Sequence, residues 1–239
     1  MDKELKNELR RDELGEAVEE AKGFFSRPEV VKPALAVAAL FLVLIGLYTA
    51  QRFRASAAES AFARATEVYH ADVDAAAAGP SSTGEKYKTS TEKFQKAKGM
   101  FDDVAKSYAS APAGRRARYY SALCLVELGQ YDAAETALNA IASLRDPGAI
   151  EPAMARARLG EVLLKGGRAK EAVAHYKALL GDDASGVPHD QILFGLATSL
   201  EAAGEKEAAR HAYSDLVNRH PQSAYAQEAR PKIEALANL

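Results

Sequence analysis

The chain has 239 residues, enough for one or two domains, and its alanine-rich composition without tryptophan is typical of an all-α protein. Its 31 Lys and Arg residues nearly balance 33 Asp and Glu residues, which disfavours a nucleic-acid partner because such a partner requires a basic face. The single cysteine, Cys124, excludes an internal disulfide and a thiolate metal cluster, and its apolar surroundings predict a buried side chain.

Residues 1–32 are predicted to form a charged cytoplasmic tail. They contain seven Lys and Arg residues and nine Asp and Glu residues. Leu5, Leu9, Val18 and Phe25 are spaced among these charges as in an amphipathic helix, although a solvated tail fits the same composition.

Residues 33–50 contain no charged side chain and are predicted to form a transmembrane helix. At 1.5 Å per residue they span roughly 27 Å, close to the apolar core of a bilayer. A buried core helix would seldom run this long without a polar position. A cleavable signal peptide is also disfavoured, because the preceding segment is long and partly acidic and no small-residue cleavage site lies beside Gln51–Arg54.

The orientation of this span is not fixed by charge, because three Lys or Arg residues lie within twenty residues of it on either side. A short tail before one early span is typical of a signal anchor. We therefore expect a single-pass protein with its N-terminus in the cytoplasm and the rest of the chain exported across the membrane.

Residues 51–84 are predicted to form an extended helix and a linker. Ala55–Ala78 continues the helical pattern of the membrane segment, and the run Gly79–Gly84 breaks it. An alternative is that the segment 55–78 joins copies of the chain into an oligomer.

Residues 85–239 contain a pattern that recurs four times at intervals of 37 or 38 residues. In each copy a small residue is followed four positions later by a bulky residue and three positions after that by an aliphatic one. These offsets place all three on one face of a helix. The three columns are Ala97, Ala134, Ala172 and Ala209; Phe101, Leu138, Tyr176 and Tyr213; and Val104, Ile141, Leu179 and Leu216.

A glycine precedes the small residue by five positions in three copies, at Gly129, Gly167 and Gly204. Glycine suits a tight turn with positive φ, and an amphipathic helix such as Ala153–Lys165 lies upstream. The unit is therefore a helix–turn–helix that must stack on its neighbours to bury its apolar face.

The sequence thus predicts an α-solenoid of about four helix pairs. Glu85–Tyr108 provides the second helix of a degenerate first pair, and the later pairs cover 115–146, 153–184 and 190–221. Ser223–Ala237 is expected to cap the stack, with a kink or break at Pro231.

The repeated residues resemble the tetratricopeptide repeat (TPR) family. The best match is Arg158-Leu159-Gly160 followed by Leu163, Gly167, Ala172, Tyr176 and Leu179. The family's tryptophan is absent, and the period exceeds the usual 34 residues. We expect the surplus residues in the loops at 146–148 and 185–188.

No catalytic, cofactor or metal site is predicted, and the chain is not expected to be an enzyme. The run Gly166–Lys170 lacks the spacing and the Ser or Thr of a phosphate-binding loop. His175 and His211 fall at nearly equivalent positions on second helices, and neither has a carboxylate at the spacing of a metal site.

The TPR resemblance implies that the first helices line a concave, partner-binding face. The side chains expected there are Arg116, Tyr119, Tyr120, Leu123, Met154, Arg158, Glu161, Gln191, Phe194 and Thr198. This mixed lining suits an extended or helical polypeptide. The paired Lys, Asn and Arg residues with which some TPR domains bind a terminal carboxylate are absent.

Taken together, the tail, the early span, the alanine-rich helix and the repeats resemble the YfgM-type ancillary subunits of the bacterial SecYEG translocon. The resemblance implies a membrane-anchored protein-interaction scaffold whose partners are translocon subunits, periplasmic chaperones or translocating polypeptides, with no nucleic acid or small-molecule substrate. The segment Arg219–Ala226 also resembles envelope TPR proteins of the cell-division-coordinator type. A cytoplasm-facing TPR adaptor of opposite orientation is the remaining alternative.

Overall fold

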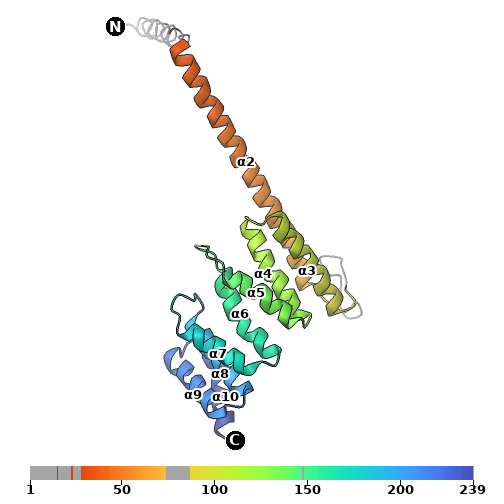
Figure 1. Cartoon of the computed structure of the whole chain (residues 1–239), viewed down its shortest axis with the longest axis vertical. Coiled ribbons are helices and arrows are strands. Elements are labelled where there is room, and N and C mark those ends of the chain that lie inside the picture. Colours follow the sequence, from red (N-terminus) through yellow and green to blue (C-terminus); the bar gives the residue numbers. More distant parts are fainter. Residues whose placement is uncertain (1–14, 16–22, 24–27, 74–86, 147, 239) are drawn as a thin grey trace, which may run out of the picture. The chain divides into compact units, whose positions relative to one another are not determined.

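The computed structural model describes residues 15, 23, 28–73, 87–146 and 148–238. Over these ranges the chain is helical, apart from turns and one isolated bridge between Val73 and Tyr87, which confirms the all-α prediction. The helices are α2 (Pro28–His70), α3 (Ser90–Ser107), α4 (Pro112–Glu127), α5 (Tyr131–Ala142), α6 (Glu151–Lys165), α7 (Ala169–Leu180), α8 (His189–Ala202), α9 (Lys206–Arg219) and α10 (Ala224–Ala237) (Figure 1). The expected break at Gly79–Gly84 lies outside the described residues, as does most of the predicted tail; of the tail, Gly15, Gly23 and residues 28–32 are described, and residues 28–32 belong to α2.

The chain divides into two units, Met1–Arg54 and Ala55–Leu239. In the first unit, the large apolar side chains of α2 from Leu35 to Tyr48 are exposed. Within the described part of the chain, α2 is the one helix long and apolar enough to cross a membrane, although by length and composition a signal sequence fits equally. Near the end of the apolar run, the Arg52 guanidinium donates a hydrogen bond to the hydroxyl of Tyr48 at 3.1 Å.

In the second unit, the part of α2 from Ala55 to His70 acts as the first helix of the first pair. Ala58 and Ala65 are fully buried, and Phe62 packs on α3 and α4. The apolar face of this segment is therefore covered by other helices of the same unit.

The prediction that this helix continues to Ala78 is wrong, because α2 ends at His70. The next residue, Ala71, is 8% exposed and packs into the core beside α3. Its carbonyl accepts a hydrogen bond from Nζ of Lys93 at 2.9 Å. Packing and this bond from α3 end the helix, although the local sequence would let it continue.

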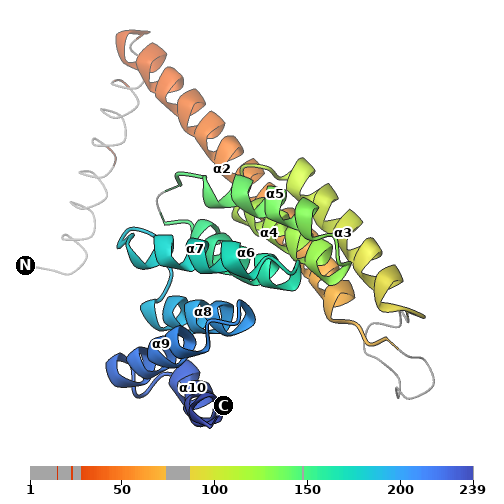
Figure 2. The same cartoon turned by 60° about the horizontal axis from the view of Figure 1, so that its bottom comes forward.

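Helix α3 begins at Ser90, five residues after the predicted start. The hydroxyl of Thr89 accepts a hydrogen bond from the backbone N–H of Glu92 at 3.1 Å and so caps the helix. The remaining pairs follow in order, α4 with α5, α6 with α7 and α8 with α9, and each helix lies beside the next (Figures 1 and 2).

All three predicted columns lie in the core of this unit. The four alanines and the residues Phe101, Leu138 and Tyr213 are fully buried, and Leu179, the most exposed of the twelve, is only 6% exposed. Each second helix therefore buries the face that the sequence pattern marks. Replacing any of these side chains removes or overfills packed volume.

The predicted glycine turns are confirmed by the backbone. Gly129, Gly167 and Gly204 have φ values of 71°, 75° and 81°, in the left-handed region that favours glycine. Each turn closes the preceding helix by a pair of backbone hydrogen bonds; at Gly167, for example, the Gly167 and Arg168 N–H groups donate to the carbonyls of Leu164 and Leu163.

Of the kink or break predicted at Pro231, the break is wrong, because α10 runs through it to Ala237. Ala226 and Ala229 before the proline and Leu236 after it are buried against the preceding helices. Lys232 also pairs with Glu201 of α8 at 2.8 Å. These contacts hold both sides of Pro231 in place, and they outweigh the lost backbone hydrogen bond.

Replacing Ala172 with Leu should lower the free energy of unfolding by about 1–3 kcal/mol, because the fully buried alanine leaves no room for added methylenes. The matched control is Ala174→Leu on the exposed face of the same helix, for which we expect less than about 0.5 kcal/mol. Denaturant unfolding followed by circular dichroism measures both. Equal effects would contradict the assignment of the buried face.

Candidate partner-binding surface

The first helices of the pairs form one layer within the repeat unit. Helix α4 lies against α6, α6 against α8, and α8 against α10. All ten side chains predicted to bind a partner lie on α4, α6 and α8 of this layer, with Arg116 at its α4 edge. The repeat register thus identified residues of the first helices, although Leu123 among them is buried in the core.

A cavity of about 530 Å³ opens in this surface between α4, α6 and the start of α8. Five of the predicted residues line it: Tyr119, Met154, Arg158, Glu161 and Gln191. Its volume lies in the range typical of ligand-binding pockets. The other lining residues are Ala149, Ile150, Ala153, Ala157, Gly186, Val187 and Pro188.

Arg158 and Glu161 are the two charged residues of this lining, and they form an ion pair with each other across one turn of α6. Burial opposes the charge on Arg158, but Glu161 and Tyr119 outweigh it and the pKa of Arg158 rises. Burial also raises the pKa of Tyr119, so its hydroxyl stays protonated at neutral pH. The cavity wall thus carries polar groups but no net charge.

Two glycines, one on α6 and one on α8, leave room for a tyrosine ring between these helices. The ring of Tyr176 from α7 lies between Gly160 and Gly195, so that a Cβ built on either glycine would come within 2.3 Å of it. The Tyr176 hydroxyl also donates to the carbonyl of Ala157 at 3.4 Å. A side chain at either glycine would push the two helices apart.

Two predicted residues of α4, Arg116 and Tyr120, contact the first helix pair. The Arg116 guanidinium donates to both carboxylate oxygens of Glu59 at 2.6 Å and lies 4.6 Å from the ring centroid of Phe62. Tyr120 is half-buried and packs edge-on against Phe62 and Tyr69. These side chains join α4 to α2 as well as facing the surface.

The remaining predicted residues are Leu123, Phe194 and Thr198. Leu123 is 8% exposed and belongs to the core beneath the surface. Phe194 is half-buried and stacks on Tyr225 of α10 at a centroid distance of 5.1 Å. The Thr198 hydroxyl bonds the Phe194 carbonyl and contacts the hydroxyl of Tyr213, so it links α8 to α9.

Several residues of this surface are not predicted by the repeat pattern. Ile150, Val187 and Pro188 come from the loops before α6 and α8, and Tyr225 comes from the capping helix. The surplus length of the two loops was visible in the sequence, but it carried no information about where they fold. Tyr225 has no counterpart in the repeat pattern, so only its contact with Phe194 reveals it.

The described part of the chain shows no clustered metal ligands, and its cysteine is a weak nucleophile. No group of three or more His, Cys, Asp or Glu side chains is placed there to hold a metal ion. Burial raises the pKa of the Cys124 thiol to about 12, so the thiolate needed for nucleophilic chemistry is scarce at neutral pH. His175 bonds the backbone carbonyl of Arg156 through Nε2 at 2.7 Å.

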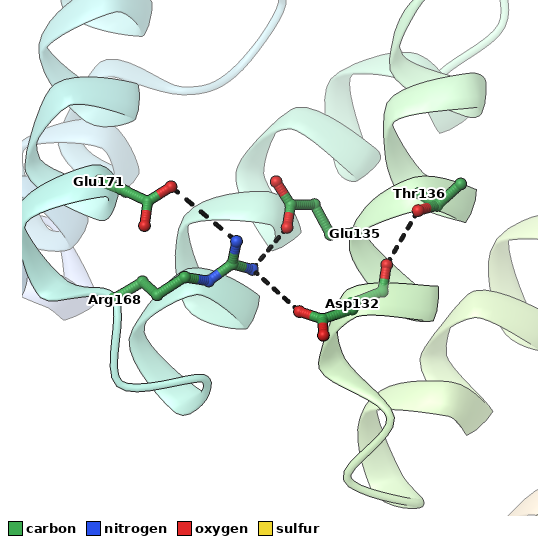
Figure 3. Close-up of polar contacts among 5 residues, drawn as sticks. All are labelled: Asp132, Glu135, Thr136, Arg168 and Glu171. Carbon is green, nitrogen blue, oxygen red and sulfur yellow. Dashed lines mark hydrogen bonds and ion pairs between the residues drawn. The ribbon is translucent and has the colours of Figure 1, made fainter.

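Charge pairing on the opposite side of the stack links the second helices. Arg168, at the start of α7, contacts Glu135 and Asp132 of α5 and Glu171 of its own helix (Figure 3). The pKa of Arg168 is raised mainly by its hydrogen bond with Glu135. Arg168 thus links α7 of the third pair to α5 of the second pair.

Two segments of the chain match models of the tetratricopeptide repeat family, residues 90–150 and residues 191–223. Helix α7, between these segments, carries the same buried columns at Ala172, Tyr176 and Leu179. A search of curated proteins found no match.

The solved structures similar to this chain include three that each cover about three fifths of it. The kinesin-light-chain TPR-like repeats of Podospora anserina are 15% identical, with 61% of this chain and 78% of that chain covered and a TM-score of 0.49. MamA from Desulfovibrio magneticus RS-1 is 20% identical, with 62% and 85% covered and a TM-score of 0.42. YrrB, described as a TPR protein with an unusual peptide-binding site, is 17% identical, with 62% and 77% covered and a TM-score of 0.39.

TPR domains are typically non-enzymatic scaffolds for protein–protein interaction, and they bind proteins or peptides. The helix pairs, the glycine turns and the two family matches lead to the same conclusion: this chain carries tetratricopeptide repeats at residues 90–150 and 191–223.

Proposed function

We propose that this protein is a membrane-anchored scaffold that binds other polypeptides on the first-helix layer of its repeats. The main observation behind this proposal is the neutral, largely apolar cavity in that layer. Five of the residues predicted from the repeat register line it. A concave site with an apolar lining and a few polar groups is the general form of a binding site.

The anchor in this proposal is the apolar part of α2, residues 33–50. Its large apolar side chains are exposed in the chain, which suits contact with lipid rather than a protein core. Tyr48 and Arg52 near its end are residue types that favour the membrane–water interface. We place the N-terminus in the cytoplasm and the repeats in the periplasm of a bacterial inner membrane.

The partners that we propose are subunits of the Sec translocon, periplasmic chaperones or polypeptides in translocation. This assignment rests on the resemblance of the chain's organisation to the YfgM-type ancillary subunits. The neutral lining of the cavity supports a polypeptide partner over a nucleic acid, because a nucleic acid would require a basic surface.

A double substitution of the central ion pair tests the binding surface. Arg158→Ala with Glu161→Ala should leave the protein folded but should abolish capture of the partners that co-purify in mild detergent, as mass spectrometry would show. The matched control is Glu207→Ala with Arg210→Ala, a pair of the same spacing on α9 with a 2.9 Å contact. Retention of every partner by the first variant would place binding elsewhere, whereas loss in both would indicate a general effect.

Cysteine labelling in intact cells tests the orientation. The native Cys124 is fully buried and should stay unlabelled, so it need not be removed. A membrane-impermeant maleimide should label Ser110→Cys, at the exposed turn between α3 and α4, but not Gly15→Cys in the tail. The reverse pattern would establish a cytoplasm-facing scaffold. Mass spectrometry of the membrane-extracted protein should also detect peptides from before residue 33, which a cleaved signal sequence would lack.

A further inference from the structure

The two loops beside the cavity are unusually long for this repeat array. Residues 143–150 between α5 and α6 and residues 181–188 between α7 and α8 are eight residues each, whereas the connections 108–111 and 220–223 have four. The longer loops supply Ala149, Ile150 and the run 186–188 to the cavity wall. We call this cavity, together with the twelve residues that line it, the notch.

Hydrogen bonds and ion pairs fix both loops against the helices. The Arg156 guanidinium donates to the carbonyl of Ser185 in one loop and to that of Ala142 at the end of α5, each at 2.8 Å. Arg115 of α4 lies 3.3 Å from the carboxylate of Asp146 in the other loop. The notch is therefore preformed, which reduces the entropic cost of filling it.

Close packing at Gly186 brings the second loop onto α6. This glycine has a φ of 72°, and a Cβ built on it would lie 3.1 Å from the Cβ of Ala153. The approach buries Val187, which is 8% exposed, in the wall of the notch. The wall is thus a packed apolar surface rather than an open loop.

The mouth of the notch carries exposed apolar side chains. Among the described residues from Ala55 onward, the large apolar side chains that are exposed are Leu144, Ile150 and Met154. Ile150 is 65% exposed and Met154 is 38% exposed, and both line the notch. Leaving such side chains in water is unfavourable, so a partner that covers them gains free energy.

The charges of the notch decide what kind of partner fits. Arg158 and Glu161 neutralise each other, so an incoming carboxylate would gain little from Arg158 and would be repelled by Glu161. An uncharged apolar side chain meets no such opposition and is attracted by Ile150, Met154 and Val187. The amide of Gln191 can bond the backbone of the same segment.

We propose that the notch is a receptor for the uncharged apolar side chains of an extended polypeptide segment, and that it selects against acidic segments. This proposal rests on the proposed function, because it names the class of polypeptide that the first-helix layer binds. The thioether of Met154 adapts its shape easily, so the notch accepts different aliphatic and aromatic side chains.

Fluorescence anisotropy with the full chain in lipid nanodiscs tests this proposal. The probe is a short labelled peptide of Gly and Ser with Leu-Phe-Leu at its centre, compared with the same peptide carrying Leu-Asp-Leu. We expect the apolar probe to bind and the acidic probe to bind at least about tenfold more weakly, since loss of one buried aromatic contact is worth that much. No binding of the apolar probe, or equal or tighter binding of the acidic one, would overturn the proposal.

The double variant Ile150→Ser with Met154→Ser should weaken binding of the apolar probe by at least about tenfold. It should leave the helical content unchanged, because both side chains are exposed. The control is Leu144→Ser, which is exposed to a similar extent, at 37%, but lies outside the notch. Equal binding by the double variant and the wild type would refute the notch as the receptor.

Partner capture separates failure of this proposal from failure of the proposed function. If the Ile150 and Met154 variant keeps every co-purifying partner and the Arg158 and Glu161 variant loses them, the scaffold function stands, and the proposal that the notch receives apolar side chains falls. If neither variant loses a partner, both proposals fall.

Discussion

Phe101→Ala should lower the free energy of unfolding by about 3–5 kcal/mol. The ring is fully buried and packs at centroid distances of 5.7 Å from Phe62 and 5.2 Å from Tyr120. It therefore joins α2, α3 and α4, and its removal leaves a cavity that three helices cannot easily close. Guanidinium unfolding of the full chain in mild detergent, followed by circular dichroism, measures the change.

The control for this prediction is Phe53→Ala, because Phe53 is 77% exposed. In detergent this change should alter the free energy of unfolding by less than about 0.5 kcal/mol. The same loss from both substitutions would show that Phe101 does not hold the first pair to the rest of the repeats.

Gly114→Ala should also lower the free energy of unfolding, by about 3 kcal/mol or more. A Cβ at this position would lie 1.9 Å from the backbone carbonyl oxygen of Tyr108, and backbone cannot move aside as a flexible side chain can. The turn between α3 and α4 would have to open. Thermal and denaturant unfolding of the purified variant should both shift towards lower stability.

Gly99→Ala is the same chemical change, but we expect it to stabilise the protein. Gly99 lies exposed within α3, and a Cβ there meets no atom within 4 Å. Alanine is the better helix former, so the variant should gain about 0.5–1 kcal/mol. If both glycine variants changed stability in the same direction, the close approach at Gly114 would not govern the effect.

Local patterns in the sequence predicted the helix pairs because their causes are local. The offsets that placed Ala172, Tyr176 and Leu179 on one helical face depend on helix geometry alone. The positive φ of Gly167 depends on the absence of a Cβ. Neither inference required knowledge of what the helix packs against.

Helix ends that depend on distant residues were predicted less well. Helix α2 ends at His70 because Ala71 packs beside α3 and bonds Lys93, which is 22 positions away in the chain. Helix α10 continues through Pro231 because Lys232 and Leu236 are held by other helices. Local propensity favoured the opposite outcome in both places.

The candidate surface combines both kinds of information. The register of the repeats identified Tyr119, Met154, Arg158, Glu161 and Gln191, because equivalent positions on stacked helices share a face. It missed Ile150, because that residue belongs to a loop whose path is fixed by long-range contacts.

The sequence by itself determined the helical periodicity, the buried columns and the glycine turns, since each follows from the geometry of a few neighbouring residues. Only the tertiary structure decided that residues 55–70 form the first helix of the first pair and that the long loops form the wall of a cavity. Those features arise from contacts such as Arg156 with Ser185, 29 residues apart, whose free energy depends on the whole stack being assembled.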